Sequence, residues 1–448
     1  MFQAPQISVL GRDPAGRTHR INGNSFQQNA ITTINGFQYV AYYTEKSRAP
    51  TSTCLVNLAR RAVNLEIESP SFGIWETIVF EDYEQVVDDG HNTISIGVCR
   101  GDGMIHLAFD HHCDELRFRT THLDDQDGNQ WSVSKFSKTQ NHVQGLEPSD
   151  FTMEVSYPRF VNVGDDLILT YRIGQAGQGS DVLYRYSAVT HEYTFLGQYL
   201  TGTTNSPYIN GLDHRLEKLH VSWCYRNFVS FPKATSPDAH KQQAGPNGPG
   251  NNFDLNYAYS EDQGNTWKSP GGQIMATIET GRVFTEENSI MPETKEMRVF
   301  DIPMGSGILN QEAQVADWDG GFWVLNREKI NGVEHWILYR RKPSAEWTKV
   351  VVKHSSGPTE IGSRAKVCVD RRSNVYLVLP GNFDDSLCIL QARKDQEYRS
   401  LKPVWIGDGY DGEPLIDVHL LEVSDVLSVF TRTAGATKEV VVLNFLLE

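Results

Sequence analysis

Apolar and polar residues alternate along this chain in short segments separated by turn residues, which is the pattern of paired β-strands. In "AITTINGFQYVAYY" (30–43), two such segments flank an Asn-Gly turn. Six further copies of this strand, turn and strand pattern lie at residues 93–109, 158–171, 208–223, 312–326, 364–379 and 414–430. Equivalent positions recur at intervals of about 50 to 65 residues, apart from one interval of about 100, so the pattern predicts a repeat structure.

Each repeat is long enough for four short strands, the content of one blade of a β-propeller. Seven repeats therefore predict an all-β fold, a seven-bladed β-propeller with four antiparallel strands per blade, over residues 1–448. The one long interval contains a Gly- and Pro-rich stretch at 230–251 and the segment 269–309. Both are interpreted as insertions in a single domain rather than as an eighth blade.

One motif supports the propeller independently of the repeat. The stretch "SEDQGNTW" (260–267) matches the Asp-box, or BNR, pattern S-x-D-x-G-x-T-W, which is typical of sialidase-like propellers. In such a box the Asp and Ser close a hairpin turn and the Trp packs between strands. The motif therefore predicts the fold and not an activity.

The hairpin geometry of a blade predicts which residues meet at the mouth of the ring. The start of the first strand and the end of the second lie together there, and residues equidistant from the turn face one another. A turn centred near residue 101 predicts that His91 faces His111, and the next turn predicts that Tyr157 faces Arg172. The same construction places at the mouth Gln28, Tyr43, Tyr208, Trp223, Tyr225, Arg327 and Arg364.

Two other histidines are expected to be structural, because His106 alternates onto the other strand face and His112 lies one step past the rim. A metal site in "DHHC" (110–113) is an alternative, but adjacent strand residues point in opposite directions and the helix or knuckle context of a His site is missing. We therefore expect catalysis to need no metal or other cofactor. Acidic turns such as "NFDDS" (382–386) could hold a structural calcium ion or simply cap the turn.

The net charge and the lengths of the apolar runs exclude some classes of binding partner. The formal net charge of −15 argues against a general nucleic-acid or anionic-membrane partner, and no apolar run is long enough to cross a bilayer. The six cysteines form no CxxC pair, so buried thiols are expected rather than a disulfide scaffold. The first twenty residues lack the apolar block of a signal peptide, so either the protein is not exported or its signal has been removed.

A mouth lined by aromatic rings, amides and arginines suits a sugar, and the Arg and His components suit a carboxylated sugar. In a uronic acid, β-elimination needs a cation at the carboxylate, a base near C5 and an acid for the departing C4 oxygen. Arg172, a histidine and Tyr157 supply these groups without a metal. Hydrolysis would instead need two carboxylates; Asp110 and Glu154 are the candidates, but Asp110 is expected to point away from the face of His111.

Four stretches carry a family resemblance: "GNSFQQNAITTINGFQYVAYY", "HNTISIGVCRGDGMIHLAFDHH", "SYPRFVNVGDDLILTYRIG" and "NFDLNYAYSEDQGNTW". They resemble the BNR-repeat propeller polysaccharide lyases, which include ulvan lyases and the L-rhamnose-α-1,4-D-glucuronate lyases (polysaccharide lyase family 42) that act on gum arabic.

The resemblance implies that His91 and His111 form the histidine pair of these lyases, beside Tyr157 and Arg172. We assign C5 proton abstraction to His91, protonation of the leaving group to Tyr157, and binding of the carboxylate to His111 and Arg172. Where some relatives have "NHDL", this chain has "NFDL", and Phe253 in place of a metal-binding histidine argues against a zinc site.

The expected substrate is a polysaccharide or oligosaccharide that contains uronic acid. A chain of charge −15 repels a long polyanion such as ulvan, which favours the rhamnose–glucuronate linkage and leaves ulvan lyase as the alternative. A sialidase-like hydrolase and a noncatalytic glycan-binding propeller are further alternatives, although "FDIP" (300–303) is a poor match to the sialidase F/Y-R-I-P signature. We expect a secreted monomer without nucleic-acid or membrane partners.

Overall fold

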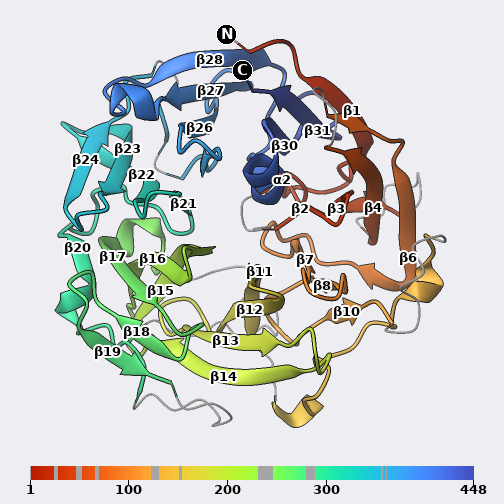
Figure 1. The fold of residues 1–448 in the computed structure, drawn as a ribbon, viewed down its shortest axis with the longest axis horizontal. Coiled ribbons are helices and arrows are strands. Elements are labelled where there is room, and N and C mark those ends of the chain that lie inside the picture. The colour runs from red at the N-terminus through yellow and green to blue at the C-terminus, as the bar shows by residue number, and fades with distance from the viewer. Residues whose placement is uncertain are drawn as a thin grey trace.

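The computed structural model of the chain is a ring of seven antiparallel sheets arranged as blades about a common axis (Figure 1). It describes residues 2–24, 29–46, 53–65, 70–122, 131–150, 154–230, 246–278, 288–354, 357–359 and 361–447. The predicted seven-bladed propeller is confirmed, and each of the seven sequence repeats forms the two inner strands of one blade.

The strands fall into four positions, counted outward from the axis. The innermost strands are β2 (Ile31–Ile34), β7 (Ile94–Val98), β11 (Val155–Val163), β15 (Asn205–Arg215), β21 (Ala313–Ala316), β25 (Lys366–Val369) and β29 (Leu415–Ile416). The second strands are β3 (Phe37–Glu45), β8 (Ile105–Phe109), β12 (Asp166–Ile173), β16 (Lys218–Asn227), β22 (Phe322–Ile330), β26 (Val375–Pro380) and β30 (Val426–Arg432). Contacts between neighbouring innermost strands run around the whole ring.

The outer half of each blade is less regular. The third strands are β4 (Cys54–Asn64), β10 (Phe118–Thr120), β13 (Ser180–Tyr186), β17 (Asn252–Ser260), β23 (Val333–Arg341), β27 (Ser386–Ala392) and β31 (Glu439–Leu446). The fourth strands are β6 (Glu76–Gln85), β14 (Tyr193–Leu200), β18 (Thr266–Lys268), β24 (Trp347–Val351), β28 (Lys402–Asp408) and β1 (Gln6–Arg12). In the second blade, isolated bridges from Phe136 and Gln140 occupy this outer position.

Five short elements extend the blades: β5 (Ser71–Phe72), β9 (His112–Asp114), β19 (Ile274–Thr277), β20 (Arg298–Phe300) and helix α2 (Val418–Val423). Strands β19 and β20 come from the segment interpreted as an insertion and add to the sheet of the fourth blade, where they pair with β18 and β17. The other proposed insertion, 230–251, lies largely outside the described residues.

The two ends of the chain close the ring together. Strand β1 pairs antiparallel with β31, with Gln6 opposite Asn444 and Arg12 opposite Glu439, so the N-terminal strand completes the blade built by the C-terminal repeat (Figure 1). Because this pairing supplies the missing edge strand, the last blade has four strands.

The core lies between adjacent blades. One buried cluster joins Tyr39 and Leu58 of the first blade to Ile96 and Leu107 of the second. All six cysteines are buried thiols that form no disulfide, as the sequence predicted. Within the described residues, helices long and apolar enough to span a bilayer are absent.

The Asp-box forms the turn between β17 and β18. Asp262 accepts hydrogen bonds from the Ser260 hydroxyl at 2.8 Å and from the backbone N–H of Thr266 at 2.7 Å. Trp267 is fully buried, and its ring stacks on Tyr199 of β14 with centroids 4.8 Å apart. The structural role predicted for this motif is therefore confirmed.

A buried histidine in the second blade makes the stability of the fold depend on pH. His106 lies in the core beside Tyr186 and Tyr193, and burial lowers its pKa to about 3. Because the unfolded side chain titrates near 6.5, the unfolded state binds the extra proton first as the pH falls, and stability is lost between about pH 6.5 and pH 3.

We therefore expect His106→Phe to reduce the loss of unfolding free energy between pH 7 and pH 5 by about 2 kcal/mol, as measured by urea unfolding at each pH. His122→Ala, at an exposed histidine, is the control and should leave the pH dependence unchanged. Equal pH dependence in His106→Phe and the wild type would contradict the assignment of a neutral His106.

Candidate functional site

A short strand at the mouth of the ring joins the second blade to the third. Strand β8 ends at Phe109, Asp110 adopts a positive φ of 62°, and the chain then crosses to the third blade as β9. There His112 pairs with Ser156 of β11. A left-handed residue at the end of a strand breaks the alternation of side chains, so the residues beyond it no longer follow the register of the hairpin.

The predicted facing of His91 and His111 is consequently wrong. Strands β7 and β8 pair Ile94 with Phe109, which centres the hairpin between residues 101 and 102 rather than at 101. His111 is buried, and its Nε2 accepts a hydrogen bond from the backbone N–H of Arg117 at 2.6 Å. His112 instead stacks on His91, with ring centroids 4.1 Å apart.

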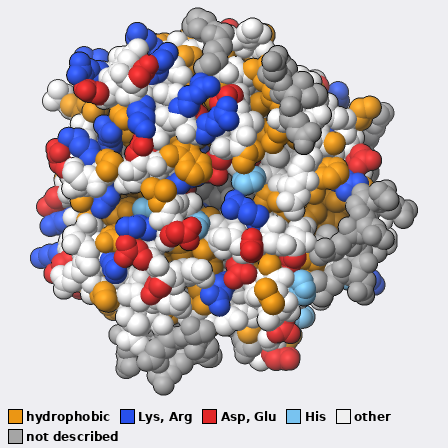
Figure 2. Space-filling view, in the orientation of Figure 1, with side chains coloured by type: hydrophobic (Ala, Val, Ile, Leu, Met, Phe, Trp, Pro, Cys, Tyr) orange, Lys and Arg blue, Asp and Glu red, His pale blue; other side chains and the backbone are white. Residues whose placement is uncertain are grey.

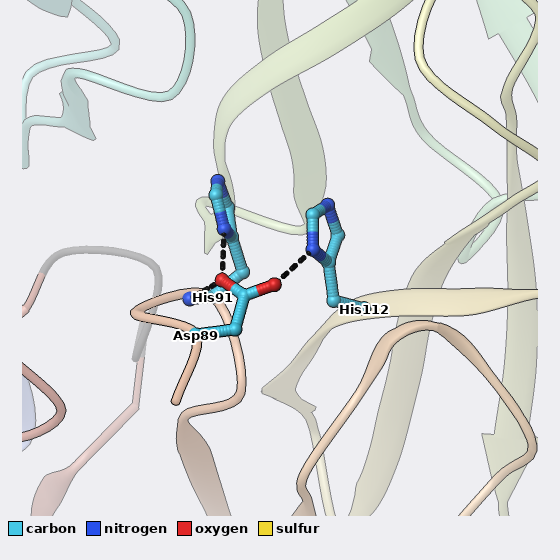
Figure 3. Close-up of side chains that lie close together, drawn as sticks. All are labelled: Asp89, His91 and His112. Atoms are coloured by element: carbon cyan, nitrogen blue, oxygen red, sulfur yellow. Dashed lines mark hydrogen bonds and ion pairs between the residues drawn. The ribbon is translucent and has the colours of Figure 1, made fainter. Parts of the chain in front are cut away.

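A carboxylate that the sequence analysis missed holds this histidine pair (Figure 3). The Asp89 carboxylate bridges the two rings: its Oδ1 lies 2.5 Å from Nδ1 of His91, and its Oδ2 lies 2.6 Å from Nδ1 of His112. Oδ1 also accepts the backbone N–H of His91 at 2.9 Å. The second nitrogen of each ring points away from Asp89, on the same side of the pair (Figure 3).

These contacts determine where the protons lie. Burial raises the pKa of Asp89, but the hydrogen bonds from His112 and His91 outweigh it and hold the pKa well below its usual range. Asp89 is therefore ionised and can only accept, so each Nδ1 carries the proton that it donates. Burial and the neighbouring His91 lower the pKa of His112 to about 4, which keeps this ring neutral at pH 7 with Nε2 as its basic nitrogen.

Tyr157 lies beside the histidine pair. Its ring centroid is 6.0 Å from that of His91 and 6.2 Å from that of His112. Tyr157 has a positive φ of 59° at a bulge in β11, an unfavourable conformation for an aromatic residue and one that clusters at functional sites. Burial raises the pKa of Tyr157 well above its usual value, so the phenol is protonated at neutral pH.

Arg172 completes this group from β12. Its guanidinium carbon lies 4.8 Å from the centre of the Tyr157 ring, although the residue opposite Arg172 in the register of β11 and β12 is Ser156 and not, as predicted, Tyr157. It donates hydrogen bonds to the hydroxyls of Tyr208 at 3.0 Å and Ser156 at 3.2 Å and to Sγ of Cys113 at 3.3 Å. Its buried Nε has no hydrogen-bond partner in the part of the chain that the structure describes. Among the described residues, no carboxylate oxygen lies within 4.0 Å of this guanidinium. Asp181 lies opposite Arg172 in the register of β12 and β13 but forms no ion pair with it, so this buried cation is suited to an anionic ligand.

A second arginine, Arg226, also contacts the Tyr208 ring and was not predicted from the sequence. The guanidinium carbon of Arg226, on β16, is 4.6 Å from the centre of the Tyr208 ring. Its hydrogen bonds go to Asn252 at 2.8 Å, Asn310 at 2.6 Å and the carbonyl of Asn247 at 3.4 Å. All three acceptors are neutral. The apolar and amide residues around Arg226 in the sequence give no signal that would have placed it here.

Three of the predicted sugar-binding aromatic residues lie in the core instead. Tyr43 is buried between the first and second blades, and Trp223 and Tyr225 are buried between the third and fourth. The reason is that side chains on the second strand of a blade face the neighbouring blades rather than the axis of the ring. Of the remaining predictions at the mouth, Tyr208 contacts Arg172, and Gln28 lies outside the described residues.

The two predicted arginines of the later blades are engaged in ion pairs. Arg327 is fully buried, and its NH2 nitrogen lies 2.8 Å from Glu312, which leaves it no exposed surface for a sugar. Arg364 donates to the carbonyl of Asn310 at 2.9 Å and lies 3.7 Å from Glu413. Both arginines therefore tie the fifth, sixth and seventh blades together.

The histidine pair and Asp89 do not have the spacing of metal ligands. Asp89, His91 and His112 are the one group of three such side chains in the described part of the chain whose donor atoms all lie within 4.8 Å of one another. Metal–ligand bonds of about 2.0 to 2.1 Å at tetrahedral angles place ligand atoms more than about 3 Å apart. The separations of 2.5 and 2.6 Å between Asp89 and the two Nδ1 atoms fit hydrogen bonds instead.

The chain matches the sequence model of the BNR repeat-containing family over residues 37–355. Among solved structures, it is similar to the polysaccharide lyase Uly1, with 16% identity, a TM-score of 0.68 and 99% of each chain covered. It is also similar to the ulvan lyase of family PL25, with 13% identity, a TM-score of 0.65, and 99% of this chain and 96% of that chain covered. A search of curated proteins finds no match. Because the family model spans most of the sequence, the chain belongs to the BNR repeat-containing family.

Proposed function

We propose that this protein is a polysaccharide lyase that cleaves its substrate at a uronic acid by β-elimination. The observation that carries the proposal is one arrangement: a histidine pair on an ionised carboxylate, beside a buried phenol and a guanidinium with no carboxylate partner among the described residues. This arrangement contains a base, an acid and an anion-binding group, the three that the reaction requires. The names of the two structural neighbours, a polysaccharide lyase and an ulvan lyase, support the same class of reaction.

In the proposed reaction, Arg172 binds the uronate carboxylate and stabilises the negative charge that develops when C5 loses its proton. His91 takes that proton at Nε2, and Asp89 stabilises the imidazolium that results. The electrons of the C5–H bond form the C4–C5 double bond, the C4–O bond breaks, and the departing oxygen takes the proton of Tyr157. The positive charge of Arg172 acts at the carboxylate, so these residues supply every group in the reaction without a metal.

His112, and not His111, is the partner of His91, and we propose a role for it other than binding the carboxylate. A neutral imidazole that donates its Nδ1 proton to Asp89 can only accept at Nε2, so it cannot donate to a carboxylate. We propose that His112 accepts a hydrogen bond from a sugar hydroxyl and keeps His91 oriented by stacking. His91 is the proton acceptor because its side chain is 34% exposed, against 11% for His112.

The carboxylates near the mouth do not support hydrolysis. Asp110 is buried and accepts hydrogen bonds from Tyr83, from Gln85 at 3.0 Å and from Asn92 at 2.6 Å. Glu154 accepts from Gln175 at 2.8 Å, and Asp89 is held between the two histidines. A glycosidase needs two carboxyl groups on either side of the bond that it cleaves, and these three have other partners.

For the substrate, we propose the L-rhamnose-α-1,4-D-glucuronate linkage of gum arabic-type glycans, cleaved outside the cell. The net charge of −15 supports a substrate with little charge beyond one uronate. Ulvan is the second candidate. Arg226 favours it, because a second guanidinium with only neutral acceptors could bind a second anionic group, and so does the name of one structural neighbour.

The test is the ultraviolet absorbance of the unsaturated uronate, measured with sugar analysis after separate incubations with gum arabic and with ulvan. Absorbance together with released rhamnose from gum arabic is the expected result. Absorbance from ulvan alone would indicate that the protein is an ulvan lyase. Free sugar without absorbance would indicate a hydrolase, and binding without turnover would indicate a glycan-binding propeller.

A glycine next to Arg172 provides a test that substitutes none of the side chains proposed to react. A Cβ atom at Gly179 would lie 2.6 Å from Cδ and 2.9 Å from Cγ of Arg172, so Gly179→Ala must displace the arginine. We expect kcat/KM for elimination to fall by about 10²-fold, because the guanidinium no longer meets the carboxylate. Gly248→Ala is the matched control, since a Cβ there meets no atom within 4 Å. Unchanged kcat/KM in Gly179→Ala would argue against carboxylate binding by Arg172.

A further inference from the structure

Whereas basic and acidic side chains are interspersed over the face of the ring that Figure 2 shows, three charged groups of the third blade are buried together. Arg159 of β11 and Asp181 of β13 are each 4% exposed, and Arg172 of β12 is 2% exposed. Asp181 pairs with Arg172 in the register of β12 and β13. Arg159 pairs with Thr170, which is two residues from Arg172, so all three charged side chains lie on one face of the sheet.

This face packs against the fourth blade. The NH1 nitrogen of Arg172 donates to the Tyr208 hydroxyl at 3.0 Å, and the NH2 nitrogen of Arg159 donates to the carbonyl of Ile209 at 3.1 Å. Tyr208 and Ile209 are consecutive residues of β15, so the two guanidinium groups occupy neighbouring positions between the blades. Two buried like charges at such positions are unfavourable without a counter-charge.

Asp181 supplies that counter-charge, and it acts first on Arg159. Burial raises the pKa of Asp181 to about 6, against the lowering effects of Arg159 first and Arg172 second. Burial lowers the pKa of Arg159 to about 10, and Asp181 is the first charge that opposes this shift. Burial also acts to lower the pKa of Arg172, but its neighbours raise it, and Tyr208 contributes more than Asp181 does. Arg159 is therefore the main counter-ion of Asp181.

Direct contacts do not fix the Asp181 carboxylate. Within the described residues, it accepts no hydrogen bond, and no nitrogen of a basic side chain lies within 4.0 Å of it. Residues opposite each other on antiparallel strands have Cβ atoms about 4.5 to 5.5 Å apart, so a change of rotamer brings Asp181 within reach of Arg172. Asp181 is thus an internal competitor of a substrate carboxylate for Arg172.

We propose that Arg159 is a positioning residue for the proposed reaction, because its charge holds the Asp181 carboxylate away from Arg172 and leaves Arg172 available to the substrate. The inference rests on the proposed role of Arg172 in elimination. Together the three buried groups carry one net positive charge, which one uronate carboxylate balances. Without Arg159, Asp181 and Arg172 would neutralise each other, and the substrate would have to displace Asp181.

The first test is kinetic. Arg159→Met should raise KM for elimination by about 10-fold or more and leave kcat nearly unchanged, because an internal competitor lowers the fraction of protein that can bind substrate. The double variant Arg159→Met, Asp181→Asn should restore KM, since the amide carries no charge, and a merely structural arginine would not be rescued in this way. Arg159→Lys, which keeps the charge, should have a KM close to that of the wild type.

Arg119→Met is the matched control, because Arg119 is another buried arginine and pairs with Asp82 at 2.6 Å in the second blade, outside the site. Its KM should equal that of the wild type. An unchanged KM in folded Arg159→Met, or a raised KM that Asp181→Asn does not restore, would overturn the proposal.

Asp181→Asn by itself decides the question if Arg159→Met fails to fold. Its KM should be equal to or lower than that of the wild type, whereas a higher KM would mean that Asp181 supports Arg172, contrary to the proposal.

A crystal structure of Arg159→Met provides a test without substrate. It should show a carboxylate oxygen of Asp181 within about 4 Å of a guanidinium nitrogen of Arg172, and a separation as in the wild type would overturn the proposal. If this ion pair forms but the wild type cleaves neither glycan, the lyase proposal fails and the control of Arg172 by Arg159 stands.

Discussion

Replacing His91 by alanine is expected to lower kcat for elimination by about 10² to 10⁴-fold, the usual range for a residue that takes part in proton transfer. His112→Ala should also lower kcat, because His112 stacks on His91 and shares the Asp89 carboxylate that orients it. The measurement is the initial rate of absorbance increase on the substrate that the two-glycan experiment identifies.

The neighbouring histidine provides the contrast. His111 is buried and accepts a backbone hydrogen bond, so His111→Ala should lower the free energy of unfolding by about 1 to 3 kcal/mol and have a smaller effect on kcat than His112→Ala. His122→Ala, at an exposed position, is the control for loss of any histidine. If folded His111→Ala lost the elimination rate while His112→Ala retained it, His111 and not His112 would be the catalytic partner of His91.

The second large effect is expected at Arg172. Arg172→Met should lower kcat/KM by about 10² to 10³-fold, since a fixed positive charge at the carboxylate is most valuable when C5 loses its proton. Arg172→Lys should recover only part of this loss, because an ammonium group cannot replace the planar guanidinium that reaches Tyr208, Ser156 and Cys113 together.

Arg185→Met is the matched control for Arg172, because this arginine of β13 is 36% exposed and lies outside the site. Each variant should be compared at several substrate concentrations. A rise in KM with unchanged kcat would mean that Arg172 only binds the substrate, and an unchanged kcat/KM would remove it from the proposed reaction.

The propeller could be predicted from the sequence because the patterns that indicate it lie within single hairpins. Turn residues and alternating apolar positions mark each inner hairpin, and the Asp-box fixes its own turn through contacts such as Thr266 to Asp262. The predicted facing of Tyr157 and Arg172 is wrong by one residue, because the bulge at Tyr157 places Ser156 opposite Arg172. The Arg172 guanidinium nevertheless lies 4.8 Å from the centre of the Tyr157 ring. Closure of the ring by β1 and β31 could not be read from any repeat, because it joins the two ends of the chain.

The candidate site was predicted only in part, because its decisive contacts cross between blades. Extrapolating the β7–β8 hairpin past Phe109 selected His111, whereas the left-handed Asp110 sends the chain to the third blade and brings His112 onto His91. Asp89 lies in the segment before β7, which has no strand pattern, so nothing in the sequence marked it as the bridge.

The sequence by itself determined the seven blades and the Asp-box turn, because each depends on neighbours within one hairpin. Only the tertiary structure decided which histidine faces His91, that Trp223 and Tyr225 pack in the core, and that Arg159 and Asp181 are buried with Arg172. The physical reason is that strand periodicity fixes the side of a strand on which a residue lies, while bulges and the packing of blades fix what lies opposite it.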